Sequence, residues 1–335
     1  MKNLIFLLGI VILITMIGCS QKDTQAPYSY DCSLDGHVVF SGMSADSIHA
    51  VVSVYPTGQN QLIAEANTDS TGYYHFENMT NIAVDIRIEA DRYDTQFITG
   101  VSLANHETVT ANTVTLLPLP QIEIRTPLMN GVIETGWSPA YENTYVSNWG
   151  ASNEMKNLYL ARDADSLYIA LTGSFATSEN CVNIYLDKDY GNNTGLSNFY
   201  TISGGSIGDH LRKDVSCPSS FGADIAFTVW QLSSDVAVVN LAFPTAVDQN
   251  QLSTVRKIVK VNIATDDVLE LSIPLNVLYS NGIVPTNTKI AIIALIGGGG
   301  DQYISNDTIP MQAIQDHSYS TTDPFVFSSV YRIKM

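Results

Sequence analysis

Charged residues are scarce in this sequence, and no part of it is rich in Lys or Arg. Only 15% of its 335 residues are charged, and 33 acids outnumber 16 bases, so the formal net charge is −17. A chain this acidic repels nucleic acid and anionic lipid headgroups, and we expect no nucleic acid among its partners. Helical periodicity is also nearly absent, which argues against a helical fold.

Cysteine is rare as well, with four copies in the chain. Apart from Cys19, near the N-terminus, only Cys32, Cys181 and Cys217 remain, so one disulfide at most is expected. We predict the pair Cys181–Cys217, because both residues fall in the same predicted domain. The alternative is that all three remain free thiols in a reducing environment.

The sequence has one long apolar run, at its N-terminus. Lys2 precedes apolar residues 4–14, and the small residue Gly18 stands directly before Cys19. This order of charge, apolar run and small residue is that of a signal peptide, which we place at residues 1–18. The run is too short to span a bilayer comfortably. Since residues 1–18 contain one Lys and no other charge, their removal changes the formal net charge from −17 to −18.

Met16-Ile17-Gly18-Cys19 resembles the bacterial lipobox, although its commonest form has Leu in place of Met16. The resemblance implies cleavage before Cys19, lipid on its thiol, and attachment to a membrane of the bacterial cell envelope, at the outer membrane or the cell surface. Residues 19–29 are polar and contain Pro, as expected of a tether. The alternative is an ordinary secreted protein in which the cysteine is coincidental.

Short runs of alternating apolar residues fill the rest of the chain. Every second residue is a large apolar one in 167–172 and again in 181–186. This period places one set on a core face and the other toward solvent or a second layer. A short helix is expected only at 274–280, where Pro274 would open it. We therefore predict an all-β protein built from β-sandwiches.

Closely spaced prolines mark a boundary between two domains. Pro118 and Pro120 are followed by Pro127. Since proline lacks an amide donor and fixes φ, such a segment suits an extended connector better than a strand interior. We place one domain at residues 30–118, the N-terminal sandwich, and another at residues 121–335, the C-terminal sandwich.

The N-terminal sandwich carries a Gly36-x-Val38 strand, the turn Asp69-x-x-Gly72-x-Tyr74-x-Phe76 and an Ala90-x-x-Tyr93 pair. In the turn, the Asp side chain is expected to cap the backbone, and Gly allows positive φ. These residues resemble the carboxypeptidase regulatory-like family of small immunoglobulin-like sandwiches. The resemblance implies a stalk or spacer without catalytic residues.

The C-terminal sandwich opens with Gly131–Trp137 and continues with strands at Asn157–Ala170, around an Asp-rich hairpin, and at Asn183–Asp187. This order resembles the family-9 carbohydrate-binding modules and their DOMON-like relatives, which are jelly-roll-type sandwiches. The resemblance implies glycan binding. We expect Trp137 itself to be packed in the core, and Asp163 and Asp165 to form the turn of the hairpin.

A loop after the third of these strands places oxygen-bearing side chains at alternating positions among glycines. Asp187, Asp189 and Asn193 would be side-chain ligands of a structural Ca²⁺, which prefers six to eight oxygens. The loop lacks the final acidic residue and the flanking helices of an EF-hand. The alternative is a polar hairpin turn formed by its Asn and Gly residues.

Sugar binding usually requires aromatic faces together with amides or carboxylates that reach hydroxyl groups. For any single aromatic, packing in the core is the alternative. The candidates for carbohydrate binding are Trp149, Trp230, Tyr145, Tyr200 and Tyr303.

Catalytic motifs are weak. Gly204–Gly208 matches the G-x-S-x-G pattern, but the parallel α/β sheet that a nucleophile elbow needs is not predicted, and a glycine-rich loop between strands is the better interpretation. Gly297–Gly300 lacks the last glycine of a dinucleotide fingerprint and is expected to be a sharply turned or mobile loop. We predict a protein that is not an enzyme.

Three hypotheses for function follow. The first is an envelope lipoprotein that binds a polysaccharide or other glycan through its C-terminal sandwich. The second is a structural or adhesive surface protein with envelope proteins as partners and no small ligand. The third is a haem-binding protein, as in some DOMON-like relatives, for which no pair of axial ligands stands out.

Overall fold

The computed structural model describes residues 31–42, 49–59, 61–104, 106–144, 146–175, 180–192, 194–202, 205–230, 236–240, 256–260, 266–312, 317–318 and 322–335, with the backbone alone at 205–207, 230, 236–240, 256–260 and 317–318. Nearly all regular structure in these residues is β-strand, which confirms the predicted fold class. Within the described part of the chain, no helix is long and apolar enough to cross a membrane.

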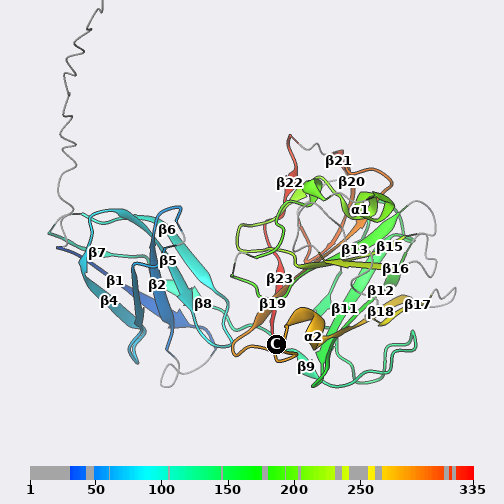
Figure 1. Cartoon of the computed structure of the whole chain (residues 1–335), viewed down its shortest axis with the longest axis horizontal. Coiled ribbons are helices and arrows are strands. Elements are labelled where there is room, and N and C mark those ends of the chain that lie inside the picture. The colour runs from blue at the N-terminus through cyan, green and yellow to red at the C-terminus, as the bar shows by residue number, and fades with distance from the viewer. Residues whose placement is uncertain are drawn as a thin grey trace, which may run out of the picture.

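Two lobes are visible in Figure 1, one formed by β1–β8 and the other by the remaining strands. The first lobe has two sheets, one ordered β4-β1-β7 with β8 also paired to β1, and one ordered β3-β2-β5-β6. Its core contains residues from both sheets, among them Leu34 and Ile86, and also Tyr93 from the segment between β5 and β6. The strands are β1 (Cys32–Phe40), β2 (Val51–Pro56), β3 (Ala64–Asn67), β4 (Tyr73–Met79), β5 (Ala83–Glu89), β6 (Gln96–Ser102), β7 (Thr108–Thr110) and β8 (Val114–Leu116).

The turn before β4 shows why its Asp and Gly are needed. The Oδ1 atom of Asp69 accepts hydrogen bonds from the backbone N–H groups of Thr71 and Tyr73, at 2.8 and 2.9 Å. Gly72 has φ +86°, and a Cβ there would lie 2.0 Å from the carbonyl oxygen of Val38. The side-chain cap and the positive φ expected from the sequence are therefore both present.

Two larger sheets form the C-terminal sandwich. One is ordered β10-β11-β12-β18-β17, with β9 paired to β11, and the other is ordered β16-β15-β13-β19-β20-β21, with β23 paired to β19. The first comprises β9 (Glu123–Ile124), β10 (Tyr141–Glu142), β11 (Glu154–Arg162), β12 (Ser166–Ser174), β17 (Arg256–Lys260) and β18 (Asp267–Pro274). The second comprises β13 (Cys181–Asp187), β15 (Ile225–Trp230), β16 (Val236–Asn240), β19 (Lys289–Gly297), β20 (Tyr303–Ile309), β21 (His317–Ser318) and β23 (Tyr331–Lys334). A small ladder joins β14 (Val215–Ser216) to β22 (Phe325–Val326).

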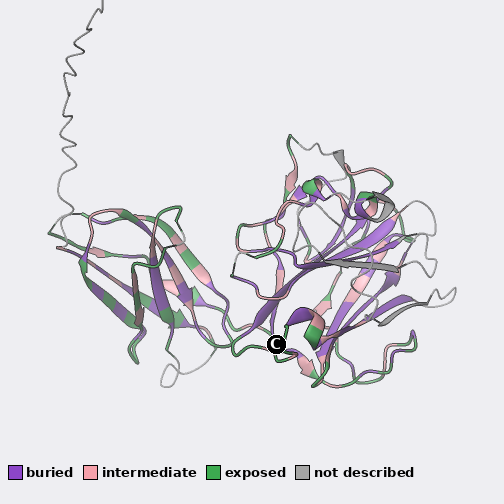
Figure 2. Ribbon diagram, in the orientation of Figure 1, coloured by how far each residue is buried: buried purple, intermediate pink, exposed green. Residues whose placement is uncertain are grey.

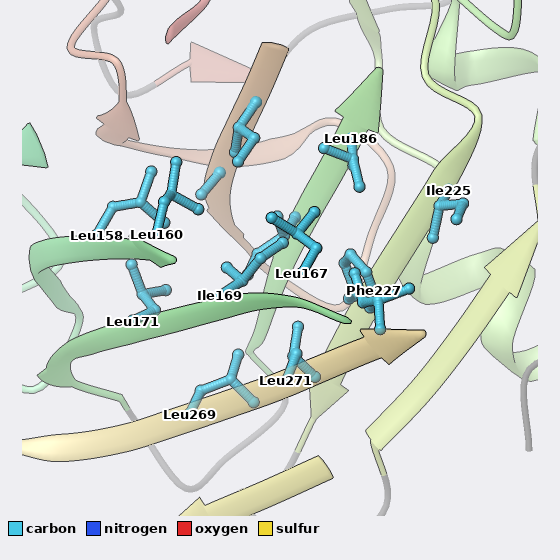
Figure 3. Packing of buried hydrophobic residues seen from close by; sticks show 14 of the residues in the cluster. Leu158, Leu160, Leu167, Ile169, Leu171, Leu186, Ile225, Phe227, Leu269 and Leu271 are labelled. Atoms are coloured by element: carbon cyan, nitrogen blue, oxygen red, sulfur yellow. The ribbon is translucent and has the colours of Figure 1, made fainter. Parts of the chain in front are cut away.

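The main core lies between these two sheets, and Figure 3 shows leucines of β11, β12 and β18 facing Leu186, Ile225 and Phe227. Leu167, Ile169 and Leu171 all belong to it, as the alternation predicts. The hairpin between β11 and β12 is closed by Asp163, whose Oδ1 accepts the N–H groups of Asp165 and Ser166.

A second apolar layer covers the opposite face of the β13–β19 sheet. It contains Tyr185, Phe199, Phe221 and Phe327, and the rings of Tyr185 and Phe199 stack with their centroids 3.7 Å apart. The central strands are consequently buried along their whole length, as Figure 2 shows. The first sheet is also covered on its outside, where Trp137 packs on Tyr159.

The two helices differ in how well they were predicted. The short helix α2 (Leu275–Leu278) follows Pro274, as expected from the sequence. Helix α1 (Gly205–Leu211) instead occupies the glycine-rich segment predicted to be a loop. Since α1 contacts both β13 and β15, tertiary packing outweighs the helix-breaking tendency of its glycines.

Charged groups join the two sandwiches. Arg332 on β23 forms an ion pair with the buried Asp94 at 2.7 Å, and Lys334 pairs with Asp91. The Nζ atom of Lys289, at the start of β19, donates to Thr95 Oγ1 at 3.0 Å. Bases of the C-terminal sandwich thus face acids and a hydroxyl of the N-terminal sandwich.

The predicted disulfide between Cys181 and Cys217 is wrong, because Cys32, Cys181 and Cys217 are all buried free thiols. The Cys181 thiol lies 3.5 Å from the carbonyl oxygens of both His210 and Gly297, at one end of β13. Cys217 follows β14 and packs in the second apolar layer. Burial raises the pKa of both thiols, so they act as small apolar groups.

Candidate functional site

Two of the aromatic residues predicted to bind carbohydrate lie together in one cleft. Trp149 and Tyr303 line an open hollow of about 590 Å³ at the end of the C-terminal sandwich where β19 turns into β20. We call this hollow the aromatic cleft. Its lining residues are Trp149, Asn153, Asn180, Gly298, Gly299, Gly300 and Tyr303.

The glycine turn allows the two rings to approach each other. A Cβ on Gly298 would lie 2.9 Å from Tyr303 Cβ and 3.4 Å from the Cη2 atom of Trp149. A Cβ on Gly300 would lie 3.1 Å from the Tyr303 ring. Any larger residue would therefore fill the floor of the cleft. Trp149 is half-buried against the main core, whereas Tyr303 is 48% exposed.

Amide groups form one wall of the aromatic cleft. The Nδ2 atom of Asn180 donates to Asn153 Oδ1 at 2.7 Å, and Asn153 Nδ2 donates to the carbonyl oxygen of Trp149 at 3.0 Å. This chain of hydrogen bonds fixes the orientation of both amides relative to the indole. Side-chain amides beside aromatic rings are the groups that meet sugar hydroxyls in binding sites.

The segment after α1 supports the glycine turn from behind. The fully buried Lys213 directs its Nζ atom at the carbonyl oxygen of Gly298, 3.4 Å away. Arg212 forms an ion pair with Asp301 at 2.5 Å, and the N–H of Asp214 donates to the Asp301 carbonyl at 3.0 Å. The turn that the sequence indicated as sharp or mobile is therefore held by several contacts.

The other predicted sugar-binding aromatics are not in the aromatic cleft. Tyr200 is half-buried in a 3-10 helix (Phe199–Thr201) elsewhere in the sandwich. The backbone of Trp230 pairs with Cys181, which itself pairs with Gly297, so Trp230 ends its strand near the cleft, but its side chain is outside the described residues. Tyr145 and the lipid-attachment residue Cys19 also lie outside them.

A second cleft, of about 480 Å³, opens at the junction of the two sandwiches and was not predicted. Phe97 and Tyr55 line it from the N-terminal sandwich, and Asn192 and Ser219 line it from the C-terminal sandwich. Phe97 is 48% exposed, the same fraction as Tyr303. The molecule therefore offers two places where an exposed aromatic ring meets polar side chains.

The predicted calcium loop brings Asp187 and Asp189 together with a third carboxylate, Asp224. One oxygen from each of the three lies within 4.8 Å of the others. Asn193, the third predicted ligand, lies outside the described residues. Asp224 was missed because it is distant in sequence and directly precedes the neighbouring strand β15, in which Ile225 pairs with Leu186. The pairing of the two strands was the signal needed to find it.

The environment of this acidic cluster disfavours negative charge. Burial, opposed by the N–H groups of Gly222 and Asp189 and aided by neighbouring carboxylates, raises the pKa of Asp187 to about 8. Burial also raises the pKa of Asp224, although Lys188 opposes the shift. The Lys188 ammonium lies 3.6 Å from Asp224. The cluster can thus balance its charge with a proton, with Lys188 or with a bound cation.

Comparisons with known proteins find distant similarities to solved structures. No family model matches the sequence, and no curated protein matches it. A family 9 carbohydrate-binding module from Caldicellulosiruptor kristjanssonii, solved with glucose, is similar over 64% of this chain and 93% of its own, at 13% identity and a TM-score of 0.35. A DUF3823 family protein from Parabacteroides merdae is similar over 84% of this chain and 98% of its own, at 9% identity and a TM-score of 0.19.

The N-terminal interface mutant of a type II cohesin–X–dockerin complex from Acetivibrio cellulolyticus is similar over 26% of this chain, at 19% identity and a TM-score of 0.21. The match spans 58% of that protein's length. At such identities and TM-scores the likenesses carry no information about a ligand.

Proposed function

We propose that this chain is a lipid-anchored cell-envelope protein whose C-terminal sandwich binds a saccharide, without cleaving it, in the aromatic cleft. The observation that supports the proposal is the convergence of Trp149 and Tyr303 on a glycine floor beside the amides of Asn153 and Asn180. Aromatic faces pack on the apolar side of a sugar ring, and amides satisfy its hydroxyls. The volume of about 590 Å³ is in the range of small-molecule sites.

The residues of the cleft favour binding over catalysis. Among the described residues, those that line it carry no carboxylate, imidazole or thiol. Glycoside cleavage usually requires two carboxyl groups that flank the scissile bond. A ring held between Trp149 and Tyr303 would meet only neutral hydrogen-bonding groups there.

The proposal is tested with the chain from residue 20, in which removal of Cys19 and the signal peptide leaves no lipid anchor. Its binding to a panel of plant, algal and bacterial polysaccharides is measured with and without Ca²⁺. Trp149→Ala and Tyr303→Ala are each expected to weaken binding about 10-fold or more, which corresponds to roughly 1.4 kcal/mol. Phe97→Ala, which removes an equally exposed ring from the junction cleft, and Tyr200→Ala are the matched controls.

The control variants decide between sites. Loss of binding in Phe97→Ala alone would move the ligand to the junction cleft. Failure of the folded chain to bind any glycan of the panel would favour the structural or adhesive function instead. The lipid anchor is tested separately in full-length protein expressed in a bacterium, where Cys19→Ala is expected to abolish acylation, as measured by mass spectrometry and detergent-phase partition.

We also propose that Asp187, Asp189 and Asp224 hold a structural Ca²⁺, and that the N-terminal sandwich acts as a spacer. Three carboxylates within 4.8 Å of one another suit a hard cation. The raised pKa of Asp187 gives the site a reason to take up positive charge. The cluster lies on the β13–β15 pair and does not line the aromatic cleft, so its role would be in stability.

A further inference from the structure

Strand β20 carries four consecutive polar residues that are completely buried, Ser305 to Thr308, and the first three of them lie at a bulge. Ser305, Asn306 and Asp307 each have no exposed surface. They fall at an irregularity in the pairing of β19 with β20, because Leu295 pairs with Thr308 whereas Gly297 pairs with Ile304. One residue of β19, Ile296, thus stands opposite three residues of β20. Such a bulge redirects side chains, and bulges are common next to functional sites.

All three bulged side chains contact the segment that carries Trp149. The hydroxyl of Ser305 lies 3.1 Å from that of Ser147, which in turn accepts a hydrogen bond from the N–H of Trp149 at 3.1 Å. Asn306 Oδ1 accepts the N–H of Asn148 at 3.0 Å. The residues on the N-terminal side of Trp149 are therefore bound to β20 through buried hydrogen bonds.

Asp307 binds both ends of the same segment. Its Oδ2 atom accepts the N–H of Met155 at 2.8 Å, and its Oδ1 atom accepts Asn143 Nδ2 at 2.5 Å. These two residues bracket Trp149 in the sequence. Since β20 begins at Tyr303, the strand that supplies one ring of the cleft also fixes the segment that supplies the other.

We infer that Ser305, Asn306 and Asp307 are positioning residues, which hold Trp149 at a fixed distance from Tyr303 and so set the width of the aromatic cleft. The inference deepens the proposed function, on which it rests for the identity of the ligand. The packing of the indole alone does not determine its place, because Trp149 is only partly buried. Buried hydrogen bonds are specific in geometry, and breaking one leaves an unpaired polar group.

The titration of Asp307 gives the inference a measurable signature. Burial, opposed by Met155 N–H and Asn143 and aided by Glu154, raises its pKa to about 6. Above that pH both carboxylate oxygens accept hydrogen bonds, and below it the added proton weakens one of them. The charged groups described near it are Glu154 at the start of β11 and the Lys156–Asp266 pair. The backbone of His317 on β21 pairs with Ile304 of the same strand.

The test is fluorine NMR of the ligand-free chain from residue 20, labelled with 5-fluorotryptophan. The Trp149 resonance is assigned by its loss in Trp149→Phe. In the wild type it is expected to shift with pH, with a midpoint near pH 6. Asp307→Asn is expected to remove this titration, and Asn306→Ala to shift the resonance at every pH. His317→Gln is the control for the histidine whose backbone pairs with β20, and it is expected to retain the midpoint.

Three results would overturn the inference: a Trp149 resonance that is indifferent to pH in the wild type, one that is unchanged in folded Asn306→Ala, or a midpoint lost in His317→Gln and kept in Asp307→Asn. If Asp307→Asn does not fold, the wild-type titration and Asn306→Ala still decide. Saccharide binding is a separate readout. If the Trp149 resonance responds as expected but the protein binds no glycan, the proposed function is refuted and the positioning role stands. If glycan binding depends on Trp149 but its resonance does not respond, the positioning role is refuted and the proposed function stands.

Discussion

The strands of the two sandwiches bury their residues in different ways. In the N-terminal sandwich, β1 and β4 alternate between buried and more exposed positions, because one face of each sheet meets the core. In the C-terminal sandwich, β13 and β19 are buried at every position. A second apolar layer covers their outer face. An alternating sequence can therefore form a sheet that is covered on one face or a sheet that is covered on both faces, which we call a two-sided sheet. Polar groups on a two-sided sheet must find hydrogen-bond partners inside the protein.

The largest expected change in the free energy of unfolding comes from removing a ring of the second apolar layer. Phe199→Ala deletes a ring that is stacked on Tyr185 and has no exposed surface, so it is expected to lower the free energy of unfolding by about 3–5 kcal/mol, the same loss that we expect for Phe227→Ala in the main core. Tyr73→Ala, on the exposed face of β4, is expected to change it by less than about 1 kcal/mol. Denaturant unfolding of the full chain checks all three. Equal effects of Phe199→Ala and Tyr73→Ala would show that the second layer is not a core.

A smaller loss in the free energy of unfolding is expected for a variant at the junction of the two sandwiches. Arg332→Met leaves Asp94 buried without its ion pair, and because Arg332 itself is partly exposed we expect a loss of about 1–3 kcal/mol. The two sandwiches should then unfold in separate transitions, as seen by calorimetry. The control is Lys156→Met, which removes a partly exposed pair with Asp266 inside the C-terminal sandwich. A single unchanged transition in Arg332→Met would contradict a junction held by charge.

The smallest effect concerns the acidic cluster of the two-sided sheet. Because the pKa of Asp187 is raised to about 8, the folded protein favours its protonated form. The stability that this preference contributes is fully present below about pH 4 and is lost as the pH rises toward 8. Ca²⁺ at about 5 mM is expected to restore roughly 1–2 kcal/mol at pH 8 and less at pH 6, where it must displace a proton.

Thermal unfolding with and without Ca²⁺ checks this expectation. Asp189→Asn should abolish the response, and Asp165→Asn, in a hairpin outside the cluster, should keep it. Absence of any Ca²⁺ response at pH 8 would argue that a proton or Lys188 balances the charge instead. A response that is equal at pH 6 and pH 8, or that survives Asp189→Asn, would mean that Ca²⁺ binds outside the cluster.

Much of the fold follows from periodicity, but the covering of its sheets does not. The alternation in 167–172 correctly predicts which residues face the main core. The alternation does not determine whether the side chains on the opposite face of the strand meet solvent or a second apolar layer. Their environment depends on where loops from distant parts of the sequence pack. The helix in the glycine-rich segment was missed for the same reason, since its contacts to β13 and β15 are absent from local sequence.

Of the residues that line the candidate site, the sequence singled out the two aromatic rings but not their meeting in one cleft. Trp149 and Tyr303 were both candidates, yet only the pairing of β19 with β20, and the bulge in it, brings them together. Asn153, Asn180 and the glycine floor carry no sequence signal that separates them from ordinary turn residues. Asp224 joined the acidic cluster through strand pairing, a contact between residues far apart in the chain.

The position of strand β19 in the fold has a mechanical consequence. It starts with Lys289 at the junction and ends with Gly297 beside the aromatic cleft, a span of about 26 Å at roughly 3.3 Å per residue. β13 flanks it along seven consecutive pairs, and β23 and β20 flank its two halves on the other side. A pull on a ligand in the cleft would load this strand lengthwise, across hydrogen bonds perpendicular to it that must fail together. Under the proposed function, this strand would resist tension between a saccharide in the aromatic cleft and the junction with the N-terminal sandwich.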